Sequence, residues 1–109
     1  MPPAIITDLP HVLPRLKSLA DENRLRILVL LATGERCVCD LQDELEIRQS
    51  LLSFHLKALR EAGLVSDRKE GRWAYYALSA PGLRALEDFV AGLRQAAETL
   101  EAGPRRCCD

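Results

Sequence analysis

The feature that most restricts the fold is a change in apolar spacing between residues 38 and 78. Apolar residues recur at helical spacing in a short segment, Val38–Leu45, and in a longer one, Gln49–Ala62, with only three residues between them. Two helices joined by so short a turn indicate a helix-turn-helix. The following stretch, "LVSDRKEGRWAYYAL", has β-prone runs on both sides of Glu70-Gly71, which predicts a β-hairpin. The expected fold is mainly α with a β-hairpin wing, a winged helix-turn-helix.

Helical spacing also predicts elements before and after this unit. One helix is expected over residues 9–19, with Pro14 at its start or at a kink, and a second from an Asp21 cap to Gly34. A long apolar pattern then predicts a last helix from residue 80 to about residue 101, followed by the tail "RRCCD". A chain of 109 residues with 48% hydrophobic residues forms one small domain, and its modest core favours a partner subunit.

The predicted helix over residues 49–62 has two chemically different sides. At 100° per residue, Leu52, Leu56 and Leu59 share one arc, and short polar and basic side chains share another. Residues 48–72 contain six basic and three acidic side chains, a balance of +3 in a chain of net charge −1. This local excess favours phosphate binding over an ordinary solvated helix face. The candidate DNA-contacting residues are Arg48, Gln49, Ser50, Ser53, Lys57, Arg60, Arg68, Lys69 and Arg72.

Two other kinds of side chain in this region are expected to be structural. His55 lies beside the leucine arc, which favours a histidine in the core over a ligand. Trp73, Tyr75 and Tyr76 are expected to pack in the hairpin, because the chain has too few further aromatic residues for a base-stacking platform.

The stretch "ERCVCDLQDELE" places Cys37 and Cys39 one residue apart at the start of the short helix. Side chains at i and i+2 of a regular helix point roughly 200° apart, so both sulfurs would meet one partner only if the first turn were distorted. The chain shows neither a signal peptide nor an apolar run long enough for a membrane span, so a cytoplasmic protein without a membrane partner is expected. Thiols stay reduced there, and Cys37, Cys39, Cys107 and Cys108 are therefore interpreted as metal ligands or redox thiols.

Four stretches, in this order, resemble the ArsR/SmtB metalloregulators: "LADENRLRILVLL", "CVCDL", "QSLLSFHLKALREAGLV" and "KEGRWAYYAL". The resemblance covers about residues 12–100. It implies a winged-helix homodimer, dimerised through the first and last helices, that binds double-stranded operator DNA, represses its own resistance operon and leaves the DNA when metal binds. On this basis residues 1–103 are expected to form the DNA-binding and dimerisation domain, and residues 104–109 a cysteine-containing tail.

The "CVCDL" segment resembles that of the arsenic-responsive members, which implies that Cys37 and Cys39 bind the inducer as thiolates. Those members have a third cysteine where this chain has Gln42. As(III) favours three thiolates, and the tail, with a reach of about 15–20 Å, brings Cys107 or Cys108 within range from the same or the other subunit. The expected inducer is As(III), with Sb(III) as a second candidate; the soft cations cadmium, lead and copper(I) are alternatives.

A thiol redox switch and an enzyme are the alternatives to a metalloid sensor. A redox switch would pair Cys37 or Cys39 with a tail cysteine and would use the same DNA-binding module. An enzyme is not expected, because the sequence offers neither a phosphate-cradling loop nor an acid–base pair near any cysteine. A zinc site of the family's other type is also not expected, since the last helix has carboxylates (Glu87, Asp88 and Glu98) but no histidine.

Overall fold

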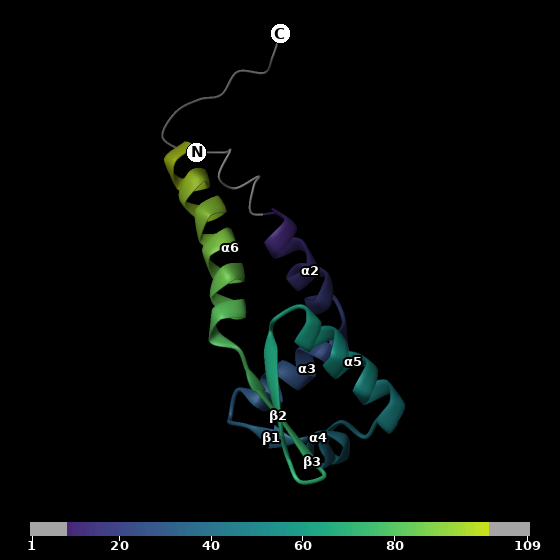
Figure 1. The fold of residues 1–109 in the computed structure, drawn as a ribbon. Coiled ribbons are helices and arrows are strands. Elements are labelled where there is room, and N and C mark those ends of the chain that lie inside the picture. Colours follow the sequence, from purple (N-terminus) through teal and green to yellow (C-terminus); the bar gives the residue numbers. More distant parts are fainter. Residues whose placement is uncertain (1–8, 101–109) are drawn as a thin grey trace.

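The computed structural model describes residues 9–100, which form a winged helix-turn-helix (Figure 1). The predicted fold class is confirmed. In chain order the elements are α2 (Leu9–Leu19), α3 (Glu22–Leu31), β1 (Arg36–Cys37), α4 (Val38–Leu45), α5 (Gln49–Glu61), β2 (Val65–Glu70), β3 (Trp73–Leu78) and α6 (Ala80–Leu100).

The turn of the helix-turn-helix depends on one residue with a left-handed backbone. Glu46 has φ 55° and ψ 44°, and its N–H donates to the Gln42 carbonyl at 2.9 Å, which ends α4. Arg48 then has an extended backbone and begins α5 without a side-chain cap. Gly63, at φ +78°, follows the end of α5 and turns the chain toward β2. The break predicted between the two helices is confirmed.

The sheet has three antiparallel strands in the order β1-β3-β2. The predicted hairpin is present, with Glu70 opposite Trp73 at its tip. The third strand, β1, was not predicted, because it has only two residues and no alternation can be recognised over that length. Its Cys37 lies opposite Tyr75 of β3, so the sheet ties the first cysteine directly to the wing.

The core lies where α3, α4 and α5 meet the sheet. Its fully buried side chains are Ile27, Leu41, Leu52, Leu56, Leu59 and Leu64. The leucine arc predicted for α5 is therefore the buried one.

The predicted end of the second helix was three residues too late: α3 ends at Leu31, and a turn leads to Gly34 at φ +135°. Asp21 caps α3 as predicted, accepting from the Arg24 N–H at 3.1 Å, and Pro14 lies inside α2.

Helices α2 and α6 lie side by side at the end of the molecule opposite the hairpin tip (Figure 1). Both expose large apolar side chains: Leu9, Leu13 and Leu16 on α2, and Val90, Leu93 and Leu100 on α6. Among the helices of residues 9–100, none combines the length and the apolar character needed to cross a membrane.

Candidate DNA interface and thiol site

The side chains predicted to contact DNA lie on α5, on the residue before it and on the wing. All nine are exposed. A groove with a volume of about 480 Å³ lies between the exposed side of α5 and the hairpin, and six of the nine line it. These six are Gln49, Ser53, Lys57 and Arg60 on α5, with Lys69 and Arg72 on the hairpin. The polar arc of α5 and the basic hairpin tip thus face one space, as a surface for nucleic acid requires.

Arg68 differs from the other basic residues of the wing. Its Nε and one terminal nitrogen donate to the two carboxylate oxygens of Glu35 at 2.8 and 2.9 Å, and its other terminal nitrogen donates to Glu70 at 2.9 Å. The guanidinium also lies 4.6 Å from the centre of the Tyr75 ring. These hydrogen bonds raise the pKa of Arg68 and lower the pKa of Glu35 below its usual range. Arg68 therefore holds the wing to the segment before β1, and its contact with DNA stays a prediction.

His55 is a structural histidine, as its position beside the leucines predicted. Its side chain is buried, its Nδ1 accepts a hydrogen bond from Arg24 Nε at 3.0 Å, and its Nε2 lies 3.9 Å from an Asp21 carboxylate oxygen. The histidine thus joins the start of α3 to the middle of α5 and helps to fix α5 on the core.

The aromatic residues of the hairpin follow the prediction only in part. Tyr76 is buried in the core, as predicted. Trp73 is 48% exposed at the hairpin tip, so the prediction that it packs was wrong. Its ring lines the groove and lies 5.6 Å from the Arg72 guanidinium. The tip of a two-stranded ribbon has no layer to cover it, which explains the exposure.

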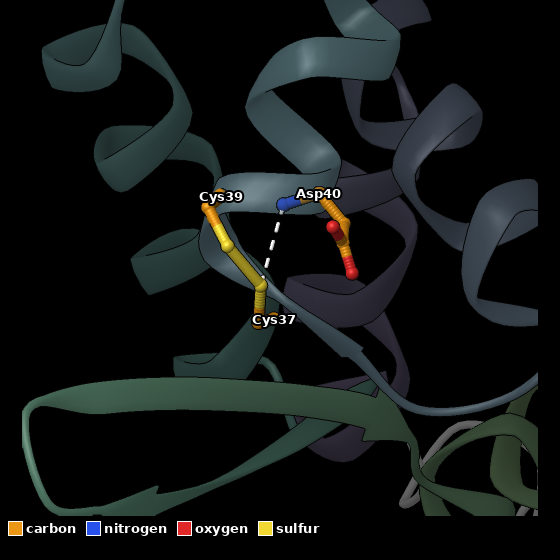
Figure 2. Close-up of a disulfide and its surroundings, with 3 residues drawn as sticks. All are labelled: Cys37, Cys39 and Asp40. Carbon is orange, nitrogen blue, oxygen red and sulfur yellow. Dashed lines mark hydrogen bonds between the residues drawn. A yellow bond between two sulfur atoms is a disulfide. The ribbon is translucent and has the colours of Figure 1, made fainter.

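The two neighbouring cysteines meet because only one of them is helical. Cys37 is the last residue of β1 and the N-cap of α4, with an extended backbone at φ −80° and ψ 160°, whereas Cys39 lies in the first turn of α4. Their sulfurs are joined in a disulfide, with 5.4 Å between the Cα atoms (Figure 2). The two sulfurs meet without a distortion inside α4, because the strand ends on Cys37 and the helix begins only at Val38.

The sulfur of Cys37 also caps α4. It accepts a hydrogen bond from the Asp40 N–H at 3.4 Å, the bond that a serine hydroxyl makes at many helix starts (Figure 2). A backbone N–H and the positive end of the helix both stabilise a thiolate at this position. The two sulfurs and the Asp40 carboxylate form a group of potential metal ligands within 4.8 Å of one another. Cys107 and Cys108 lie outside the described residues.

The two cysteines have different surroundings. Cys37 is only 8% exposed, whereas Cys39 is exposed and lines the same groove as the predicted DNA-contacting residues. Gln42, at the position of the third cysteine of the arsenic-responsive sequences, also lines this groove. Cys39 and six of the candidate DNA-contacting residues therefore line one groove.

The fold and this surface define a winged helix-turn-helix protein of the DNA-binding class. Residues 21–67 match the family model described as "Bacterial regulatory protein, arsR family". The chain is 55% identical over 64 residues to the arsenical resistance operon repressor of Escherichia coli, a match that covers 58% of this chain and 55% of that protein. It is 45% identical over 75 residues to the transcriptional activator HlyU of Vibrio cholerae, covering 69% of each chain. The chain belongs to the ArsR family of bacterial regulatory proteins.

A solved structure supports the same conclusion. The fold is similar to the homodimeric winged helix-turn-helix DNA-binding domain from Mycobacterium bovis, with a TM-score of 0.67, 32% sequence identity, and coverage of 94% of this chain and 93% of that one. The chain spans little more than half the length of the Escherichia coli relative. The relatives named here are regulators and not enzymes, in agreement with the class predicted from the sequence.

Proposed function

We propose that the protein is a transcriptional repressor that binds double-stranded operator DNA as a homodimer and is released when thiolates bind As(III) or Sb(III). The observation that carries this proposal is the convergence of the Cys37 and Cys39 sulfurs, together with the position of Cys39 on the groove that Ser53 and Lys57 also line. A relative in Escherichia coli is named an arsenical resistance operon repressor. Soft thiolate ligands suit trivalent arsenic, and both sulfurs already lie within reach of one centre.

The exposed apolar sides of α2 and α6 support the homodimer. Six large apolar side chains are exposed along these two adjacent helices, and an apolar surface of this kind favours association with a second copy. The related domain from Mycobacterium bovis is homodimeric. In such a dimer the two α5 helices would enter successive major grooves, about 34 Å apart along the duplex.

Release follows from the shared groove. As(III) held by Cys37 and Cys39 adds bulk beside the polar side of α5, and it acts on the strand that pairs with the wing. If As(III) binds the free protein more tightly than the DNA complex, DNA binding is weakened about tenfold for each 1.4 kcal/mol of difference. A difference of a few kcal/mol is enough to empty an operator. The third ligand is proposed to be Cys107 or Cys108, in place of the cysteine that Gln42 replaces.

Thiolate-to-arsenic absorption of the reduced chain tests the ligand set. We expect an ultraviolet band that saturates at one As(III) per thiol site and disappears in Cys37→Ser and in Cys39→Ser. Loss of the band in the double variant Cys107→Ser/Cys108→Ser would assign the third ligand to the tail. A band that persists without Cys37 and Cys39 would contradict the proposed site.

A second candidate function, a thiol redox switch, is favoured by the disulfide itself. The redox switch expected from the sequence pairs Cys37 or Cys39 with a tail cysteine, whereas the structure pairs Cys37 and Cys39 with each other. In this alternative, oxidation closes the disulfide and reduction opens it, with no metalloid involved. DNA affinity that changes between the reduced and oxidised proteins, and not with arsenite, would favour the switch.

A further inference from the structure

The two sulfurs of the disulfide differ in accessibility and in stability as thiolates. Cys39 is exposed at the groove, whereas Cys37 is buried and its sulfur accepts the Asp40 N–H (Figure 2). Thiol–disulfide exchange is favoured by attack on the accessible sulfur and by departure of the better stabilised thiolate. An incoming thiol therefore attacks Cys39, and Cys37 leaves.

The groove beside Cys39 is cationic. Four basic side chains line it, and one of them, Arg60, is paired with Asp67 at 3.2 Å. Within residues 9–100 the remaining three, Lys57, Lys69 and Arg72, form no ion pair. One negative charge opposes these three positive charges: the carboxylate of Asp40, which lies within 4.8 Å of both sulfurs (Figure 2).

The size of the groove is suited to a small molecule. Its volume of about 480 Å³ lies within the range of ligand pockets, and the ring of Trp73 and the side chain of Leu56 add apolar surface. A ligand that attaches to Cys39 and fills this space should carry negative charge and have the dimensions of a short peptide.

We propose that Cys39 is a site of S-thiolation by a small peptide thiol that carries carboxylates. The thiolate of the small molecule attacks the Cys39 sulfur and forms a new S–S bond, the Cys37–Cys39 bond breaks, and Cys37 departs as a thiolate that holds the Asp40 N–H. One disulfide is thus exchanged for another, and no further oxidant is needed. The attached molecule would occupy the groove between α5 and the wing. Any effect of this modification on DNA binding rests on the proposed function, whereas the modification itself is independent of that function.

Full-length variants with one reactive thiol test the site and its preference for an anionic partner, because the mixed disulfide at Cys39 is the same product whether a small thiol attacks the Cys37–Cys39 disulfide or the Cys39 thiolate attacks a small disulfide. Cys107→Ser and Cys108→Ser are combined with Cys37→Ser, which leaves Cys39 and keeps a cap on α4 because serine also accepts the Asp40 N–H. The probes are oxidised glutathione, which is anionic, and cystamine, which is cationic. Attack of Cys39 on either disulfide yields the mixed disulfide and one released thiol, and the rate of mass increase is measured by intact-protein mass spectrometry.

For each variant, the rate with oxidised glutathione is divided by the rate with cystamine. This ratio is measured for the folded protein and for the protein unfolded in urea, and the unfolded ratio corrects for the intrinsic reactivity of the two probes. We expect the folded ratio to exceed the unfolded ratio by about tenfold, and to lose this excess when Lys57 and Lys69 are both replaced by Gln. An excess below about threefold, or one that the two Lys→Gln substitutions do not reduce, would overturn the proposal.

The matched variant exchanges the roles of the two cysteines. With Cys39→Ser in place of Cys37→Ser, only the buried sulfur is left, and we expect thiolation at least about tenfold slower. Equal rates for the two variants would overturn the assignment to Cys39. The assay contains neither DNA nor arsenite. A negative result here therefore does not contradict the proposed repressor function, and this assay stays interpretable if the proposed repressor function is wrong.

Discussion

Replacement of Gly82 by alanine should destabilise the protein, although alanine is the better helix former. Gly82 is buried in the first turn of α6, where that helix crosses the chain just after α5. A Cβ at this position would overlap the carbonyl oxygen of Gly63 and lie 3.4 Å from the Cα of Leu64. Both obstacles are backbone atoms, so no flexible side chain can move aside, and the whole start of α6 must shift.

The size of the effect follows from two opposed terms. Helix propensity favours alanine by at most about 1 kcal/mol. Forcing an extra methyl into a packed contact costs about 1–3 kcal/mol, and the upper end applies here because backbone must move, so we expect a net loss of about 2 kcal/mol in the free energy of unfolding. For a domain of this size that loss lowers Tm by about 8–16 °C.

Thermal and urea unfolding, followed by circular dichroism at one fixed protein concentration, measure this loss. Arg84→Ala, at an exposed position of the same helix, serves as the control and should change stability by less than about 0.5 kcal/mol. A Gly82→Ala protein as stable as the native chain, or more stable, would refute the close contact between α6 and the end of α5.

Three further predictions concern the site. In the reduced protein, Cys37→Ser should keep the cap on α4 and cost little stability, whereas Cys37→Ala leaves the Asp40 N–H without an acceptor and should lower the free energy of unfolding by about 1 kcal/mol in urea titrations with a reductant present. Because Arg68 lowers the pKa of Glu35 in the folded state, their contact stabilises the protein above the unfolded pKa and is lost on acidification; Glu35→Gln should therefore flatten the fall in stability between roughly pH 5 and 3. Lys57→Ala should reduce the slope of log affinity against log salt for DNA by about 0.9 if that lysine contacts phosphate, and an unchanged slope would exclude the contact.

Most of the fold could be predicted because its signals are local. The break between α4 and α5, the Asp21 cap and the leucine arc of α5 each depend on residues within a few positions of one another. Strand β1 could not be predicted, since its two residues are extended only because β3 pairs with them. This strand is also what brings Cys37 beside Cys39, so the geometry of the thiol pair depended on a contact between distant segments.

The exposure of the nine candidate DNA-contacting residues could be predicted, because side-chain position on a helix follows from periodicity; their contact with DNA stays a prediction. The role of Arg68 was not foreseen, as its partner Glu35 lies 33 residues away and no spacing rule connects them. The groove that Cys39 and Lys57 both line was not foreseen either, because it exists only once α4, α5 and the wing are packed together. The sequence thus identified the chemical groups, and the structure showed which of them share a surface.

We propose that Cys39, which lines the same groove as the candidate DNA-contacting side chains, couples arsenite binding to release of DNA. The most direct test is fluorescence anisotropy of the reduced protein on a DNA fragment from the promoter of its own operon, titrated with arsenite. We expect DNA binding that arsenite weakens at least tenfold in the native chain and leaves unchanged in Cys39→Ser. Release of the Cys39→Ser protein by arsenite, or tight binding of the native protein throughout the titration, would contradict the account.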